Sequence, residues 1–148
     1  MSPPTGDGEH VILTVEDNPA EVRLLREAID AQDRAVTHLV ATDSDEAFDV
    51  LYTRAERAET SKPDLVLLDI DLPSRSGIEV LTELRAREGF QTLPIIMYSS
   101  TNQEETIQTC YEKGANAYVV KPTNYDEMVA SIDHLLRFWV DTARLTAK

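Results

Sequence analysis

The stretch Leu65-Val-Leu-Leu-Asp69-Ile-Asp-Leu-Pro73 decides the fold, because four consecutive apolar residues lead directly into a carboxylate. A short apolar run without alternation is typical of a strand buried on both faces of a parallel sheet. Asp69 would then stand at the carboxyl end of that strand, which is the edge where open α/β sheets bind ligands. We therefore expect Asp69 to be a functional residue of a parallel α/β protein.

On both sides of this stretch, apolar segments alternate with helical patterns. The predicted strands are residues 11–15, 36–41, 65–68, 95–98 and 117–120. The predicted helices begin near Pro19, Ser44 (or Asp43), Ser76, Gln103 and Tyr125. Strict alternation with short loops predicts an α/β fold with a doubly wound, flavodoxin-like parallel sheet. We expect five strands in the order 2-1-3-4-5, flanked by five helices.

Length and composition fit a single domain, since the chain has 148 residues and a hydrophobic content of 42%. We expect a flexible leader at residues 1–9, the folded domain at residues 10–141, and an extension of the last helix or a tail at residues 142–148. No apolar run approaches the roughly 20 residues that span a membrane. The single cysteine, Cys110, excludes an intramolecular disulfide. These features favour a cytoplasmic protein with no membrane association.

The charge of the chain is strongly negative, at −13 from 27 acidic and 14 basic residues. A nucleic-acid-binding surface would need a face rich in Lys and Arg, so the composition argues against a nucleic-acid partner. Ten of the basic residues are Arg and only four are Lys. An acidic excess with little lysine suits a halophilic protein, because high salt screens the repulsion between acidic side chains.

Charged and polar residues follow the ends of four predicted strands. Glu16 and Asp17 follow the first strand, Asp69 the third, Ser99 the fourth and Lys121 the fifth. The first and third strands are neighbours in the predicted order, so the three carboxylates should meet in one crevice. Ser99 and Lys121 should lie on the opposite side of the same mouth.

Three carboxylates at close distance repel one another, and one lysine cannot offset them all. Mg²⁺ prefers carboxylates combined with waters and phosphate oxygens, so we predict Mg²⁺ as the cofactor. A phosphoryl group arriving at Asp69 would meet the metal on one side and Lys121 and Ser99 on the other. Such a site favours phosphoryl transfer with Asp69 as an in-line carboxylate nucleophile.

Over residues 11–136 this set of residues resembles the receiver domain of response regulators, the CheY-like phosphoacceptor module of two-component signalling. The matching positions are the acidic pair Glu16 and Asp17, the phosphoacceptor Asp69, the backbone-carbonyl metal ligand Asp71, the hydroxyl and aromatic switch residues Ser99 and Tyr118, and the pair Lys121 and Pro122. Residues 16–25 and the pair Phe138-Trp139 resemble stand-alone regulators paired with phytochrome-type histidine kinases.

The resemblance implies that a histidine kinase or a histidine phosphotransfer protein donates a phosphoryl group to Asp69 in a Mg²⁺-dependent reaction. Such a protein catalyses only its own phosphorylation and slow dephosphorylation, so it is a signalling protein and not an enzyme with an external substrate. The chain ends soon after the last predicted helix, so we expect no attached output domain. The signal should therefore pass to a downstream protein by direct contact.

A homodimer is also expected, through the surface formed by the fourth helix, the fifth strand and the fifth helix. Apolar residues of the last helix form one stripe, and Phe138 lies about 100° from Trp139, at the edge of that stripe. An aromatic residue in that position favours an interface. The resemblance implies that phosphorylation draws Ser99 toward the phosphoryl group and lets Tyr118 turn inward, so we expect phosphorylation to tighten the dimer.

Two alternatives remain open from the sequence. Asp69-Ile-Asp71 also resembles the start of the haloacid-dehalogenase phosphatase motif, in which the second Asp acts as a general acid. Pro73 stands where that motif carries Thr or Val, and the short chain leaves no room for a cap domain. The second alternative is a pseudo-receiver that acts as a scaffold without phosphorylation, against which the intact acidic set argues.

Overall fold

The computed structural model describes residues 10–58 and 62–142, so the expected leader and the last six residues of the expected tail lie outside the described residues. Its centre is a parallel sheet of five strands in the order β2-β1-β3-β4-β5, as predicted. The strands are β1 (His10–Val15), β2 (Val36–Ala41), β3 (Leu65–Leu68), β4 (Ile95–Ser99) and β5 (Ala117–Val120). All four residues of β3 are buried, which confirms the interpretation of its unalternating apolar run.

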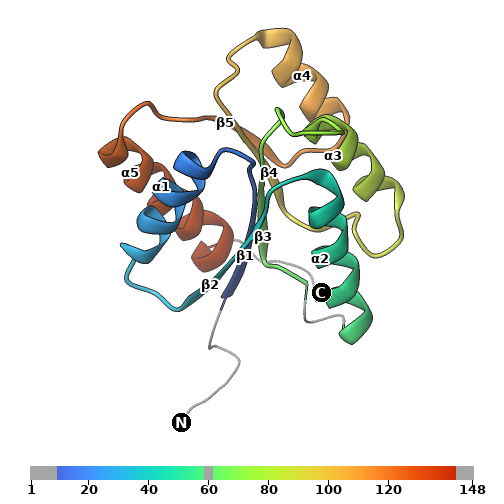
Figure 1. The fold of residues 1–148 in the computed structure, drawn as a ribbon, viewed down its shortest axis with the longest axis horizontal. Coiled ribbons are helices and arrows are strands. Elements are labelled where there is room, and N and C mark those ends of the chain that lie inside the picture. Colours follow the sequence, from blue (N-terminus) through green and yellow to red (C-terminus); the bar gives the residue numbers. More distant parts are fainter. Residues whose placement is uncertain (1–9, 59–61, 143–148) are drawn as a thin grey trace.

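Helices connect consecutive strands (Figure 1). They are α1 (Pro19–Asp30), α2 (Ser44–Arg57), α3 (Gly77–Ala86), α4 (Glu104–Glu112) and α5 (Tyr125–Leu136), which continues into a π-helical turn, η3 (Arg137–Thr142). Their starts follow local chemistry: Asn18 caps α1 with Pro19 at the first position, and Ser76 and Glu79 form a reciprocal capping box on α3. Within the described residues, every helix is too short or too polar to span a lipid bilayer.

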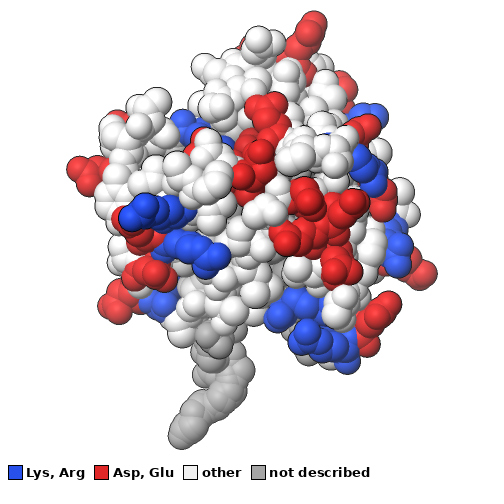
Figure 2. All heavy atoms as spheres, viewed as in Figure 1, with Lys and Arg blue, Asp and Glu red and all other residues white. Residues whose placement is uncertain are grey.

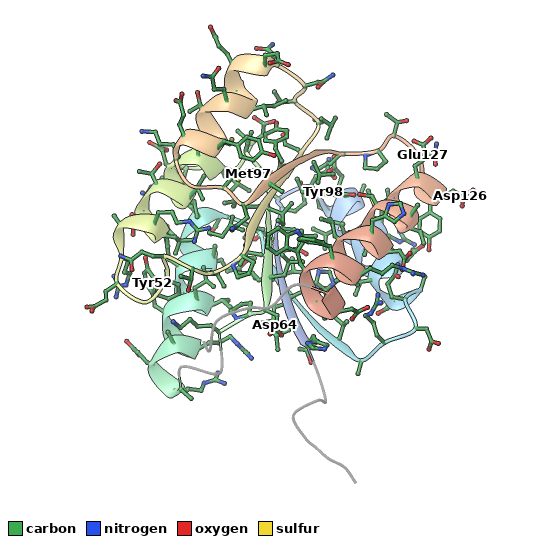
Figure 3. The ribbon with its side chains drawn as sticks, turned by 180° about the vertical axis from the view of Figure 1, so that it is seen from behind. Tyr52, Asp64, Met97, Tyr98, Asp126 and Glu127 are labelled. Carbon is green, nitrogen blue, oxygen red and sulfur yellow. The ribbon has the colours of Figure 1, made fainter. Side chains whose placement is uncertain are left out.

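The helices form two layers, with α1 and α5 on one face of the sheet and α2, α3 and α4 on the other (Figure 1). Each layer closes over its own hydrophobic core. Met97 and Tyr98 on β4 show the division, because they point to opposite faces of the sheet (Figure 3). The sheet is therefore covered on both sides, and its strand ends are left as the place where polar groups gather.

The strand register brings the expected site residues to one edge. Val15 of β1 pairs with Ala41 on one side and with Leu68 on the other, so Glu16 and Asp69 leave the sheet at the same level. Ser99 at the end of β4 pairs with Val120 of β5, and Lys121 follows directly. The parallel topology thus assembles residues that lie about 100 positions apart in the sequence, as Glu16 and Lys121 do.

The end of the last helix differs from the expected α-helical spacing. After Leu136 the backbone closes π-helical hydrogen bonds, so the angle between successive side chains is smaller than in an α-helix. Trp139 is half-buried against the α1/α5 core, whereas Phe138 is 52% exposed. The two rings still meet edge to face, with centroids 5.0 Å apart. Phe138 is therefore on the surface as expected, but on a π turn.

Candidate functional site

The three carboxylates expected at the sheet edge lie together. Oxygen atoms of Glu16, Asp17 and Asp69 fall within 4.8 Å of one another. Glu16 and Asp69 are buried, whereas Asp17 is exposed at the mouth. Asp69 Oδ1 also accepts a hydrogen bond from the backbone N–H of Ile70 (2.8 Å), which leaves Oδ2 as the oxygen directed at Lys121.

Lys121 enters this group from the end of β5 and is itself buried. Its Nζ donates to Glu16 Oε1 (2.6 Å) and to Asp69 Oδ2 (3.3 Å). A third hydrogen bond, to Oε1 of Glu21, was not expected from the sequence. Glu21 lies in the first turn of α1, and its proximity to a lysine 100 positions away depends on the packing of α1 against α5, the helix that follows Lys121 in the chain. The one sequence signal was an acidic residue in the turn that follows the acidic pair.

The electrostatics of the group follow from burial. Burial, which has the largest effect, and the nearby Asp69 charge together raise the pKa of Glu16 to about 7, although the Lys121 hydrogen bond opposes this change. Burial alone would lower the pKa of Lys121, but its hydrogen bonds to Glu16 and Glu21 and the Asp69 charge outweigh burial and raise it. Lys121 therefore carries a positive charge at neutral pH, and it faces more negative groups than it can neutralise.

The loop after Asp69 depends on a close backbone approach that the sequence analysis missed. A Cβ placed on Gly77 would lie 2.0 Å from the carbonyl oxygen of Asp69 and 2.9 Å from Ile70 Cα. The Gly77 N–H also donates to the Ile70 carbonyl (2.8 Å), and Ser74 adopts a positive φ of 72° in the same loop. A glycine at the first position of α3 was the available signal, since α-helices favour other residues there.

The expected switch residues lie on neighbouring strands, with Ser99 at the end of β4 and Tyr118 on β5. Ser99 is fully buried, and its Oγ accepts from the backbone N–H of Thr101 (3.3 Å). Tyr118 is half-buried and donates its hydroxyl to the carbonyl of Thr101 (2.8 Å). Burial raises the pKa of Tyr118, and a hydrogen bond with Ser99 partly opposes that change. Ser99 and Tyr118 are therefore both hydrogen-bonded to Thr101, in the loop that follows β4.

The last two expected residues lie outside the buried group. Among the described residues, the side chain of Asp71 is not part of the carboxylate group, and it is exposed. Its expected role involves only the backbone carbonyl, so that role stays a prediction. Phe138 lines an open hollow of about 460 Å³ on the β5/α5 side of the molecule. Val119, Ala130, Leu135 and Trp139 make the lining of this hollow mainly apolar.

The chemistry of the carboxylate group fits a hard divalent cation. Mg²⁺ binds through one or two carboxylates and retains waters that a phosphate oxygen can replace. Glu16, Asp17 and Asp69 offer oxygen ligands within one cation's reach. In the described part of the chain, Lys121 is the cationic side chain that pairs with Glu16 and Asp69, and one ammonium cannot balance three carboxylates. The arrangement can therefore hold a divalent metal next to a carboxylate nucleophile and a fixed cationic hydrogen-bond donor.

Known proteins resemble the chain along nearly its whole length. The family model of the response regulator receiver domain matches residues 12–133. The response regulator Rcp1 of Synechocystis sp. is 28% identical over 137 residues, which cover 93% of each protein. A crystal structure of its Mn²⁺-bound form has a TM-score of 0.81 and covers 93% of this chain and 99% of its own.

Two further solved structures are similar. The phosphorylated cyanobacterial phytochrome response regulator RcpA is 32% identical, with a TM-score of 0.84, and covers 93% of this chain and 99% of its own. The response regulator RPA3017, in red light signaling of R. palustris, is 30% identical, with a TM-score of 0.85, and covers 94% of this chain and 99% of its own.

Proposed function

Because the chain belongs to the response regulator receiver domain family, we propose that Asp69 accepts a phosphoryl group from a histidine kinase or a histidine phosphotransfer protein. The observation that carries this proposal is the buried Asp69 carboxylate, held between the acidic pair and the Lys121 ammonium. Receiver domains are signalling proteins, and we propose that this one catalyses only its own phosphorylation and slow dephosphorylation.

The transfer is a displacement at phosphorus. An oxygen of Asp69 forms the new bond to phosphorus while the bond from phosphorus to the donor's imidazole nitrogen breaks, and its electron pair stays on that nitrogen. The product is an acyl phosphate on Asp69. Lys121, fixed beside Oδ2 at 3.3 Å, neutralises charge on the phosphoryl oxygens, and Ser99, the last residue of β4, would donate a hydrogen bond from its hydroxyl.

Glu16, Asp17 and Asp69, together with the backbone carbonyl of Asp71, would hold a divalent cation, which we propose to be Mg²⁺. When bound, such a cation supplies charge neutralisation for the phosphoryl group. The Mn²⁺-bound form of Rcp1 supports the choice of a divalent metal for this chain. The chain's own contribution is to keep these oxygens together on neighbouring strand ends, where Glu16 and Asp69 are already shielded from bulk water.

The direct test uses a small acyl or amido phosphate and Mg²⁺ without any kinase. We expect one phosphoryl group on Asp69, detected by intact mass and peptide mapping, and no uptake in Asp69→Asn. Asp17→Asn should slow uptake, and so should chelation of the metal, because a ligand or the metal itself is removed. A haloacid-dehalogenase-type phosphatase would instead release many phosphates per chain. Unchanged labelling of Asp69→Asn would contradict the proposal, and so would rapid release of many phosphates per chain.

Output is proposed to pass through direct protein contact at the α4–β5–α5 surface. Phosphorylation would draw Ser99 toward the phosphoryl group and release Tyr118 from Thr101, to which its hydroxyl is now bonded at 2.8 Å. The exposed Phe138 and the apolar hollow beside it favour a homodimer on this surface, tightened by phosphorylation. RcpA is a phytochrome response regulator, and the similarity to it favours a phytochrome-type kinase as the phosphodonor.

A further inference from the structure

All three N–H donors of the Lys121 ammonium already have acceptors in the structure. An ammonium group carries three N–H donors, and Nζ of Lys121 contacts Glu16, Glu21 and Asp69. Its side chain is only 7% exposed, so water has little access to it. A phosphoryl oxygen on Asp69 can receive a full hydrogen bond from Lys121 only if one of the present contacts weakens.

The three carboxylates that accept from Lys121 differ in how easily their hydrogen bond to it can break. The Glu16 side chain is 3% exposed, and its second oxygen accepts from the Asn18 N–H (3.1 Å), so it is held at both ends. Asp69 is the group that receives the phosphoryl. The Glu21 side chain is 33% exposed, and Lys121 is the partner that the structure gives it. Because Glu21 can be hydrated when it leaves Lys121, breaking the Glu21 contact has the smallest free-energy cost of the three.

Glu21 also adds negative charge where the phosphoryl group must arrive. Glu16, Asp17 and Asp69 already make the site acidic, and a phosphorylated Asp69 would carry more negative charge than the free carboxylate. Each further carboxylate near the ammonium reduces the net attraction that Lys121 exerts on the incoming group. The start of α1 fixes this arrangement, because Asn18 caps the helix and Pro19 occupies its first position, two residues before Glu21.

We propose that Glu21 is a positioning residue that holds Lys121 in a resting contact and thereby slows phosphoryl uptake at Asp69. This inference rests on the proposed function, since it concerns the rate of the same transfer. It predicts that loss of the Glu21 charge releases one Lys121 donor for the phosphoryl group, while the acidic set that holds the metal remains complete.

The test compares Glu21→Gln with Glu27→Gln. Both changes remove one negative charge from α1 and keep the side-chain length, but Glu27 faces solvent and pairs with Arg23 at 3.7 Å. At saturating Mg²⁺, with a small phosphodonor, Glu21→Gln should take up phosphoryl about 3- to 10-fold faster than wild type, and Glu27→Gln should stay within about twofold. Beryllofluoride mimics a phosphoryl group on a carboxylate. Glu21→Gln should bind it more tightly than wild type, and Glu27→Gln should bind it about as tightly as wild type. Thermal unfolding checks that both variants are folded.

A double-mutant cycle shows whether Glu21 acts through Lys121. In a Lys121→Gln background, adding Glu21→Gln should change the uptake rate by less than half as much, on a logarithmic scale, as it does in wild type. Equal rates for Glu21→Gln and Glu27→Gln would overturn this inference alone, and so would a full Glu21 effect without Lys121. If wild type acquires no phosphoryl group on Asp69, the proposed function fails first and this inference with it.

Discussion

At the scale of single residues, the close approach of Gly77 to Asp69 is the feature most sensitive to change. An alanine methyl there meets the backbone of Asp69 and Ile70, which no side-chain rotation can relieve. We expect Gly77→Ala to lower the free energy of unfolding by about 2 kcal/mol or more. We also expect it to slow phosphoryl uptake, because the loop that carries the Asp69 carbonyl must move.

Gly89→Ala is the matched control for Gly77→Ala. Gly89 has a φ of 92°, but the nearest atom to an added Cβ is the flexible end of Lys62, at 3.5 Å. Gly89→Ala should lower the free energy of unfolding by about 1–2 kcal/mol through backbone strain, and it should leave phosphoryl uptake unchanged. Urea unfolding and the phosphodonor assay decide between the two. If Gly77→Ala is as stable as wild type and takes up phosphoryl at the same rate, the close backbone approach at Gly77 does not constrain the loop.

His38 is the residue whose environment ties stability to pH. Its Nε2 lies 2.8 Å from the Thr14 hydroxyl. Burial, which has the largest effect, and the positive charge of Arg26 together lower the pKa of His38 to about 4, against the opposing charge of Asp30. A histidine in an unfolded chain titrates near about 6.5, so between these values the unfolded state binds a proton that the folded state does not. Stability present at pH 7 is therefore lost as the pH falls from about 6.5 toward 4.

His38→Gln isolates this contribution, because glutamine can still bond to Thr14 but does not titrate. Between about pH 7 and pH 4.5, wild type should lose about 1–3 kcal/mol more unfolding free energy than His38→Gln, after allowing for the exposed part of the ring. Urea titrations at each pH give the difference. Parallel losses in the two proteins, or an NMR titration of the His38 ring near pH 6.5, would show that the pKa is not depressed.

At the scale of elements, α2 and α3 are joined by an aromatic stack with cations over each ring. Phe48 and Tyr52 stack at 5.5 Å, and Tyr52 meets Phe90 edge to face at 5.5 Å. Arg87 lies 3.8 Å above Tyr52, whose hydroxyl donates to Glu83 (3.3 Å) on the side of α2 that faces α3 (Figure 3). These ring, cation and hydrogen-bond contacts link α2 to α3 and to the residues that follow α3.

We expect Tyr52→Ala to destabilise the fold by about 2–4 kcal/mol, because the central ring of the stack is lost. Tyr52→Phe removes only the hydroxyl, and its weak hydrogen bond limits the loss to about 1 kcal/mol. Chemical denaturation of the two variants and wild type measures both values. Equal stabilities for Tyr52→Ala and Tyr52→Phe would mean that the ring contributes little to the joint.

The π turn η3 is the element on which the proposed dimer depends. Phe138→Ala removes the exposed ring that lines the apolar hollow and should weaken dimerisation at least about tenfold. Arg57→Ala is the control, because Arg57 is also an exposed large side chain but stands at the end of α2, in the helix layer on the other face of the sheet from α5. Sedimentation equilibrium with and without phosphodonor gives the dissociation constants. A wild type that stays monomeric in both states would refute the dimer.

The elements that the sequence predicted are those with a local signal. Apolar runs placed the five strands within one residue of their observed bounds, and residues that can cap a helix placed the starts of α1, α2 and α3. Glu16, Asp69 and Lys121 came together as expected because parallel strand ends share an edge. The Glu21 contact and the π turn could not be predicted in this way. The contact depends on long-range packing of α1 against α5, and the π turn depends on backbone hydrogen bonds that no single residue type specifies.

At the scale of the whole molecule, the unbalanced charge is spread over a small surface. On the face shown in Figure 2, acidic side chains gather across the middle, and Lys and Arg lie nearer the edges. With a net charge of −13 on 148 residues, mutual repulsion opposes the compact state. The ion pairs that could offset it are mostly partly exposed, such as Arg75–Glu83 at 2.8 Å, and pairs of that kind contribute little.

If this acidic surface is a salt adaptation, the melting temperature should rise steeply between low salt and about 1 M KCl, where the Debye length falls to about 3 Å. Repulsion is greatest at low salt, so most of the gain should come below about 0.5 M, and NaCl should act equally well because screening depends on ionic strength. Exclusion of solute from the surface would instead give a gain that continues to grow above 1 M. Thermal unfolding across a salt series in both chlorides separates the two effects. A flat melting temperature would mean that acidic repulsion is a minor term in this fold, and the excess of Asp and Glu would then have no bearing on the salt in which the protein works.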